Sequence, residues 1–267
     1  NVNLVANGLL RLGVQKGDVV SVQLPNWWEF VVLSFATFKL GAVINSLTPI
    51  YRQKEVSFIM KLTESKVVVV PEIFRDFNYL EMMRELRPSL PSLEKIIVVS
   101  ESNISYEDSD VISFDMIIKG NFKKEGDTYK DIKVDPNSLV QLGFTSGTTG
   151  EPKGVMHTHN TLEATVRNYV EHMKFERKTM RNLVVSPVGH QTGFLWGTIM
   201  TVFLNGTMIY LDIWNKEKAL KIMQKEKITH MIAAYPFLHD IAMIENIEKK
   251  RPSSLKFICI PGAPIPR

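Results

Sequence analysis

The sequence has little cysteine and no long apolar run. Cys259 is the single cysteine among 267 residues, which excludes an internal disulfide framework and a zinc site built from several thiolates. A membrane-spanning helix needs about 18 or more apolar residues in succession. The longest candidate, residues 30–40, is too short and contains Lys39 near its end, so it is expected to be a buried helix. These absences predict a protein of the reducing cytoplasm without a membrane span.

Clusters of like charge are also missing. The 32 basic residues are interspersed with 28 acidic ones, which leaves a net charge of +4. Proteins that bind nucleic acid usually gather their Lys and Arg residues on one face or arm. No nucleic-acid partner is therefore expected.

Three nucleotide-binding or catalytic motifs are absent. The chain has no Walker A loop, no G-x-G-x-x-G fingerprint, and no G-x-S-x-G elbow. These absences argue against a P-loop NTPase, a Rossmann dinucleotide site and an α/β-hydrolase triad.

Short apolar segments alternate with amphipathic ones along most of the chain. Strands are predicted at residues 19–24, 42–45, 67–70, 96–99, 183–186, 207–211, 230–233 and 256–261. Helices are predicted at residues 2–12, 27–40, 53–63, 79–86, 157–174, 192–204, 216–226 and 236–246. Strands that alternate with helices are typical of βαβ units. The fold class is thus α/β, with parallel-rich sheets flanked by layers of helices.

The alternation is interrupted by a polar stretch, residues 100–136. Only residues 111–118 within it are clearly apolar. We interpret the stretch as a surface excursion that carries one short helix, in preference to a linker between folding units. The chain is expected to form two packed subdomains, one of about residues 24–175 and one that joins residues 1–20 with residues 181–267.

The most informative stretch runs from Thr145 to Val155 and reads Thr-Ser-Gly-Thr-Thr-Gly-Glu-Pro-Lys-Gly-Val. Glycines and small hydroxyl residues allow backbone N–H groups to converge on an anion. Lys153 adds a mobile positive charge suited to a phosphate. A flexible connector is the ordinary alternative for any short stretch rich in Gly, Ser and Thr.

Other candidate residues follow predicted strands. Gly189, His190, Thr192 and Gly193 lie between a strand and a helix, where open α/β sheets bind ligands. Taken alone, His190 would more often be a capping or core histidine than a ligand-binding one. Tyr235 follows a second strand. His157 and His159 lack nearby carboxylates or thiolates, so a metal pair is not expected there.

A further segment, Pro261-Gly262-Ala263-Pro264, follows the last predicted strand. Small residues at a strand end let a planar group stack against the backbone. A simple Pro-rich turn is the alternative.

The eleven residues from Thr145 to Val155 together resemble the phosphate-binding loop of the adenylate-forming enzymes, which include the acyl-CoA synthetases. Residues 38–45 also match an early motif of this superfamily, and residues 186–193 resemble its aromatic or histidine motif. In that family a carboxylate attacks the α-phosphorus of Mg-ATP, which gives an acyl adenylate and pyrophosphate, and the CoA thiol then displaces AMP. The resemblance therefore implies ATP, Mg²⁺ and CoA as ligands and a small-molecule carboxylic acid as substrate.

The resemblance also implies roles for individual residues. The residues that would cradle the β- and γ-phosphates are Thr145, Ser146, Gly147, Thr148, Thr149 and Gly150, with Lys153 adding charge. The hydroxyl of Thr145 would help to hold Mg²⁺. Gly262, Ala263 and Pro264 would meet the adenine, although the family usually has glycine where Pro261 stands. His190 is the predicted catalytic residue and would meet the substrate carboxylate, while Gly189, Thr192, Gly193 and Tyr235 would border the acyl pocket.

The resemblance covers the first half of such an enzyme. The family's Tyr-Gly-x-Thr-Glu segment and its late catalytic lysine would lie beyond Arg267. The chain is thus expected to be an incomplete N-terminal adenylation domain without the small C-terminal domain, and to have little or no ligase activity alone. A peptide-synthetase adenylation domain and a non-catalytic nucleotide-binding scaffold are the alternatives. The sequence leaves open whether the protein forms a homodimer.

Overall fold

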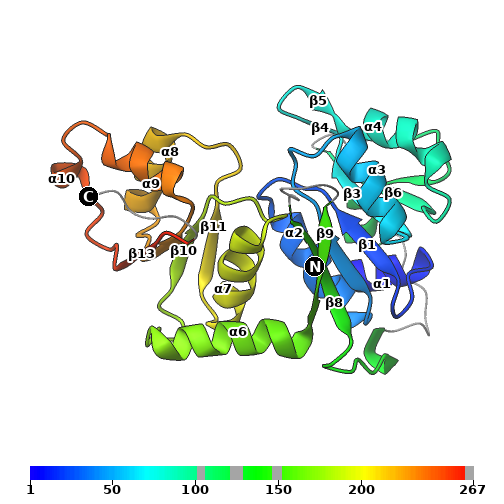
Figure 1. Cartoon of the computed structure of the whole chain (residues 1–267), viewed down its shortest axis with the longest axis horizontal. Helices are drawn as coiled ribbons and strands as arrows, with labels where there is room; N and C mark the ends of the chain where they lie inside the picture. The colour runs from blue at the N-terminus through cyan, green and yellow to red at the C-terminus, as the bar shows by residue number, and fades with distance from the viewer. Residues whose placement is uncertain (101–105, 121–128, 146–151, 262–267) are drawn as a thin grey trace. The chain divides into compact units, whose positions relative to one another are not determined.

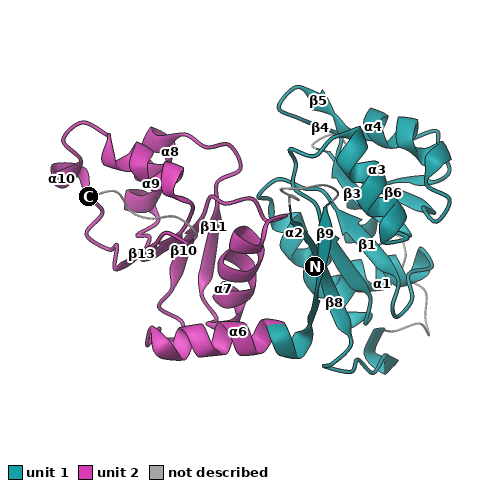
Figure 2. Ribbon diagram, viewed as in Figure 1, with its two compact units in different colours: residues 1–161 teal, residues 162–267 magenta. Residues whose placement is uncertain are grey.

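The computed structural model describes residues 1–100, 106–120, 129–145 and 152–261. The chain divides into two compact units, residues 1–161 and 162–267, and the division falls within helix α6 (His159–His172; Figure 2). Each unit contains its own mostly parallel sheet, so the predicted α/β class is confirmed. Among the residues described, no helix has both the length and the apolar character needed to cross a membrane.

Unit 1 is built on a seven-stranded sheet with the order β7-β6-β3-β1-β2-β8-β9. Its strands are parallel except for β9, which pairs antiparallel with β8 at one edge. The strands are β1 Val19–Val22, β2 Val43–Ser46, β3 Val67–Pro71, β6 Lys95–Val99, β7 Val111–Ser113, β8 Leu139–Thr145 and β9 Lys153–Thr158. A separate antiparallel pair is formed by β4 Ile73–Phe74 and β5 Phe77–Asn78.

Helices cover both faces of this sheet. They are α1 Val2–Arg11, α2 Trp28–Lys39, α3 Gln53–Leu62, α4 Tyr79–Leu86 and α5 Phe114–Ile118, with the short 3₁₀ turns η1 Arg87–Ser89 and η2 Tyr129–Asp131. Val68 and Val70 of β3 pack into a core with α3 and α4, which lie beside β3 and β6 (Figure 1). Val67 and Val69 point to the opposite face and are equally buried. Each such valine stabilises the fold by roughly 1.5–3 kcal/mol, which explains the four-valine run.

Three local predictions differ from the structure of unit 1. Residues 111–113, expected within a surface excursion, pair with β6 as the edge strand β7, while the expected short helix is α5. The helix expected from residue 157 begins at His159, because residues 153–158 are held in β9 by the ladder to β8. Residues 1–20, expected with 181–267, belong to unit 1, because α1 packs against α2 and α5 and β1 pairs with β2 and β3.

Unit 2 contains a four-stranded parallel sheet with the order β11-β10-β12-β13. Its strands are β10 Arg181–Val184, β11 Thr207–Tyr210, β12 His230–Ile232 and β13 Phe257–Cys259. Its helices are the rest of α6, the π-helical segment η3 Thr192–Ile199, and α7 Met200–Phe203, α8 Lys216–Lys225, α9 Tyr235–Ala242 and α10 Ile247–Lys250. Helices α8 and α9 share an apolar core with β10 and β12.

The π-helical segment is held to the sheet by buried polar side chains. The side-chain amide of Asn182 donates hydrogen bonds to the carbonyl of Trp196 at 3.0 Å and to the hydroxyl of Thr201 at 2.9 Å. The hydroxyl of Thr201 donates in turn to the carbonyl of Gly197 at 2.7 Å. A widened helical turn leaves backbone carbonyls poorly paired. These side chains satisfy them and fix the segment that follows His190.

Candidate functional site

The predicted phosphate-binding stretch joins the two strands of an edge hairpin. Thr145 ends β8 and Lys153 begins β9, and the two residues are direct partners in the antiparallel ladder. Side chains of directly opposed residues lie on the same face, with Cβ atoms about 5 Å apart. The Thr145 hydroxyl also makes a long hydrogen bond of 3.4 Å to the Lys153 carbonyl. One face of the hairpin end therefore carries both a hydroxyl and an ammonium group.

The residues between these two lie mostly outside the described part. Ser146, Gly147, Thr148, Thr149 and Gly150 are among them, so their role in cradling phosphates stays a prediction. The role of Thr145 at Mg²⁺ stays a prediction as well. Its exposed hydroxyl at the end of a strand is an oxygen ligand of the type that Mg²⁺ accepts, and thus fits that assignment.

Buried polar residues outside the sequence motifs lie at the same carboxyl edge of this sheet. Ser46 ends β2, the neighbour of β8, and pairs in register with Gly143. The amide of Gln23 donates to the carbonyls of Thr48 at 3.1 Å and Tyr51 at 3.0 Å, which fixes the turn after β2. The side-chain oxygens of Gln23, Ser46 and Thr48 have no hydrogen-bond partner among the described residues. Their sequence signal was a polar residue at, or within two residues of, the end of an apolar strand.

The first histidine candidate, His190, lies in the turn between β10 and η3 in unit 2. Its backbone N–H donates to the Pro187 carbonyl at 2.9 Å, and its ring Nδ1 accepts from the Thr192 N–H at 3.2 Å. Because Nδ1 is an acceptor, the neutral ring carries its proton on Nε2. The side chain is exposed, so this N–H group is available to a ligand. Its catalytic role stays a prediction.

Gly193 is buried and has a structural reason to be glycine. A Cβ atom there would lie 2.5 Å from the carbonyl oxygen of Ser186 and 2.5 Å from the carbonyl carbon of Pro187. The missing side chain thus makes room for the backbone of the preceding turn. The expected place of Gly193 at the border of the acyl pocket stays a prediction.

The remaining candidates of unit 2 share one edge of its sheet. The His190 segment follows β10, Tyr235 follows β12, and Pro261 follows β13. These three strands are adjacent and parallel, so their carboxyl ends meet at the same edge. Tyr235 is half-buried, and its ring lies 5.5 Å from that of His239. Gly262, Ala263 and Pro264 lie outside the described residues.

The structure gives no support for a metal site at the pair His157 and His159. His159 begins α6 and packs edge-on against Phe38, with ring centroids 5.5 Å apart. Burial lowers the pKa of His157 and of His159, which favours their neutral forms. Among the described residues, no three His, Cys, Asp or Glu side chains are grouped in a way that could hold a metal ion.

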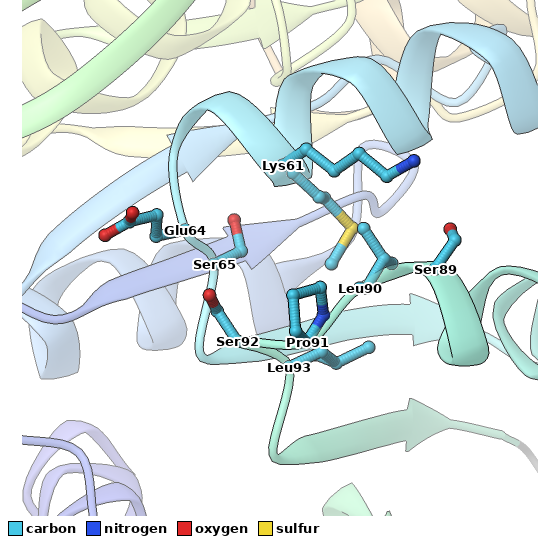
Figure 3. A pocket seen from close by; sticks show the side chains of 9 residues that line it. Lys61, Glu64, Ser65, Ser89, Leu90, Pro91, Ser92 and Leu93 are labelled. Carbon is cyan, nitrogen blue, oxygen red and sulfur yellow. The ribbon is translucent and has the colours of Figure 1, made fainter.

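Two clefts lie away from the predicted residues, one in each unit. The first has a volume of about 320 Å³ and lies between the end of α3 and η1 (Figure 3). Lys61, Glu64, Ser89 and Ser92 are among the side chains that line it. The second, of about 310 Å³, is lined by His230 and Phe257 among others. Neither cleft is lined by a residue that the sequence motifs singled out.

Comparison with known proteins gives a consistent family. The whole chain, residues 1–267, matches the family described as AMP-binding enzyme. It is 30% identical to a medium-chain fatty-acid–CoA ligase of Escherichia coli (strain K12) over 98% of this chain and 45% of that protein. It is 26% identical to the mitochondrial medium-chain acyl-CoA ligase ACSF2 of Homo sapiens over 99% of this chain and 46% of that protein.

Solved structures show the same fold. The inhibitor-bound N-terminal domain of FACL13 from Mycobacterium tuberculosis superposes with a TM-score of 0.83 at 23% identity, over 99% of this chain and 62% of that one. The anthranilate CoA ligase AuaEII, in complex with anthranoyl-AMP, superposes with a TM-score of 0.79 at 21% identity, over 96% and 48%. The chain thus spans about half the length of the ligases that it matches.

Proposed function

Because the chain belongs to the AMP-binding enzyme family, we propose that the full-length protein containing it is an AMP-forming acyl-CoA ligase. It activates a carboxylic acid with ATP and transfers the acyl group to CoA. The observation that carries this proposal is the pairing of Thr145 with Lys153 at the end of the hairpin. The names of the relatives support the CoA thiol as acceptor in preference to a carrier protein, and a medium-chain acid as substrate.

The proposed chemistry divides into binding and charge neutralisation. A carboxylate oxygen forms a bond to the α-phosphorus while the bond to pyrophosphate breaks. Lys153 and the Thr145 hydroxyl bind the departing phosphate oxygens, where negative charge develops, and Mg²⁺ supplies further neutralisation when bound. The Nε2–H group of His190 orients the carboxylate of the acid. We place the enzyme in the cytoplasm, in keeping with its single cysteine.

The test is a panel of acids on the full-length protein, with pyrophosphate release measured with and without CoA. Butanoate, octanoate, palmitate and benzoate separate the chain-length classes, and octanoate is expected to give the highest kcat/KM. One methylene changes discrimination by only about 1–3 kcal/mol, so neighbouring chain lengths will overlap. Release of pyrophosphate without any acid dependence would contradict the proposal.

Two variants test the residue assignment. Lys153→Ala should lower kcat/KM for pyrophosphate release about 100-fold, since it removes a group that stabilises developing charge. Thr145→Ala should lower it about tenfold and Thr145→Ser should restore it, because only the hydroxyl is needed. Lys61→Ala, at another exposed lysine of unit 1, is the matched control and should leave activity unchanged. Full activity in both Lys153→Ala and Thr145→Ala would remove the phosphate assignment.

A further inference from the structure

The cleft of unit 2 that is lined by His230 and Phe257 combines features of a small-molecule site. Its volume of about 310 Å³ is at the lower end of the range for ligand pockets, roughly 300–1,000 Å³. It is lined by His230, the first residue of β12, and Phe257, the first residue of β13. It therefore lies at the amino edge of the sheet, whereas the His190 and Tyr235 segments follow the carboxyl ends. Strands of three residues separate the two edges by about 10 Å.

The polar ring of this cleft belongs to His230, a residue that is only 7% exposed. Its Nδ1 lies 2.7 Å from the Thr229 hydroxyl, while that hydroxyl is 3.3 Å from the Arg181 carbonyl. The shorter contact favours a hydroxyl that donates to Nδ1, which leaves the ring proton on Nε2. Within the described residues, the hydrogen bond of the His230 ring is the one at Nδ1. The Nε2–H group is the donor left for a ligand.

Aromatic rings form the apolar wall. The Phe175 ring meets His230 edge-on at a centroid distance of 4.8 Å and Phe257 edge-on at 5.0 Å. Such perpendicular arrangements present both ring faces and ring edges, which suit a further aromatic ring. Burial and the nearby Lys256 charge lower the pKa of His230 to about 4. The imidazole is hence neutral at pH 7 and can stack as an aromatic surface.

The charge in the cleft is positive. Lys174 and Lys256 line it together with one acid, Glu176, and all three side chains are exposed at its rim. The lining thus has a net charge of one positive unit beside the neutral imidazole. An anionic group is favoured there, held by the ammonium groups and by the Nε2–H of His230.

We propose that this cleft binds a small aromatic carboxylate, with its ring against Phe175 and Phe257 and its carboxylate at Lys256 and His230. Binding here is separate from the proposed ligase reaction, because the lining residues lie at the opposite edge of the sheet from His190. The site does not require ATP, Mg²⁺ or CoA. An aromatic acid could thus bind to unit 2 without occupying the proposed acyl pocket.

The test uses sodium benzoate as the probe and NMR of the histidine rings of this chain as the readout. Benzoate should cause a saturable shift of the His230 ring signals, and benzamide, its uncharged analogue, should not. Lys256→Gln should weaken the apparent affinity about threefold, as expected for an exposed charge. Phe257→Leu should weaken it as well, while Lys61→Gln, a lysine that lines the cleft of unit 1, should not change it.

The outcomes separate this site from the acyl pocket. A benzoate shift of His190 without one of His230 would overturn the cleft and leave the ligase proposal intact. Equal shifts of His230 with benzamide, or an unchanged affinity in both Lys256→Gln and Phe257→Leu, would also overturn it. Loss of ligase activity in the full-length Lys153→Ala variant, with the His230 shift retained, is the expected pattern if both proposals hold.

Discussion

Substitution of Gly193 by alanine tests the turn that carries His190. The added Cβ would lie 2.5 Å from the Ser186 carbonyl oxygen, well inside the ordinary contact distance of about 3.4 Å, so backbone must move by nearly an ångström. That backbone is held in place, because the Pro187 carbonyl accepts the His190 N–H at 2.9 Å. Overpacking costs about 1–3 kcal/mol when side chains can yield. Because the atoms that the Gly193 Cβ would meet belong to the backbone of Ser186 and Pro187, we expect Gly193→Ala to lower the free energy of unfolding by about 3 kcal/mol.

Gly197 provides the matched control, because its neighbour is a side chain. A Cβ there would lie 2.6 Å from Cγ1 of Val184. Gly197→Ala should cost about 1–2 kcal/mol, since the helix propensity of alanine offsets part of the clash. Val184→Ala removes that clash, so the double variant should show a favourable coupling of about 1 kcal/mol. The same Val184→Ala change should not rescue Gly193→Ala.

The assay is urea denaturation followed by tryptophan fluorescence, since Trp196 lies within η3 and packs on Tyr169 at a centroid distance of 4.6 Å. A change in midpoint at constant slope reports stability. A loss below about 1 kcal/mol for Gly193→Ala would refute the backbone clash, and so would a rescue by Val184→Ala as large as that of Gly197→Ala.

Two further predictions concern other parts of unit 2. The pKa of His230 is lowered to about 4 from an ordinary value of 6.5, so the unfolded chain binds the extra proton and stability falls as the pH drops from about 6.5 to 4. After allowance for solvent at the cleft, His230→Gln should remove about 1–2 kcal/mol of that pH dependence, and an unchanged denaturation profile would contradict it. Asn215 accepts a hydrogen bond from the Lys218 N–H at 2.8 Å as the N-cap of α8. Asn215→Ala should thus cost about 1 kcal/mol in the same denaturation assay while Asn215→Ser costs little, and equal losses would argue against capping.

The sequence predicted the strands and helices with strong local patterns. The four valines at residues 67–70 marked a strand buried on both faces, and α4 begins and ends where its apolar spacing indicated. Both signals are local, since burial of a regular face dictates the residue types. The prediction of mostly parallel sheets followed from the alternation of strands with helices along the chain.

The hairpin strand β9 was missed because its stability is not local. Residues 153–158 contain a glycine next to the lysine and are exposed over most of their length, so no apolar alternation marks them. Pairing with β8, which lies earlier in the chain, holds them extended. Edge strands of this kind depend on a partner more than on their own composition. The helix start was misplaced by two residues for the same reason.

For the candidate site, the motifs found the strand ends but not the contacts. His190 was placed correctly after β10, yet its hydrogen bonds to Pro187 and Thr192 depend on a turn that the sequence does not specify. The backbone atoms of Ser186 and Pro187 beside Gly193 were not predicted, while the assignment of Gly193 to the border of the acyl pocket stays a prediction. The His230 cleft was not predicted at all, because Phe175 and Phe257 are distant in sequence and meet only through the order of the strands.

The Thr145–Lys153 ladder pair also determines how this region can tolerate insertions and deletions. The two anchoring residues are fixed by strand pairing, so a change in the number of residues between them alters the span without moving either anchor. A one-residue deletion within β9 would instead turn every following side chain to the other face of the sheet. A length change between Thr145 and Lys153 should therefore preserve the sheet of unit 1 while removing the proposed phosphate binding, whereas a length change within β9 should damage the sheet itself.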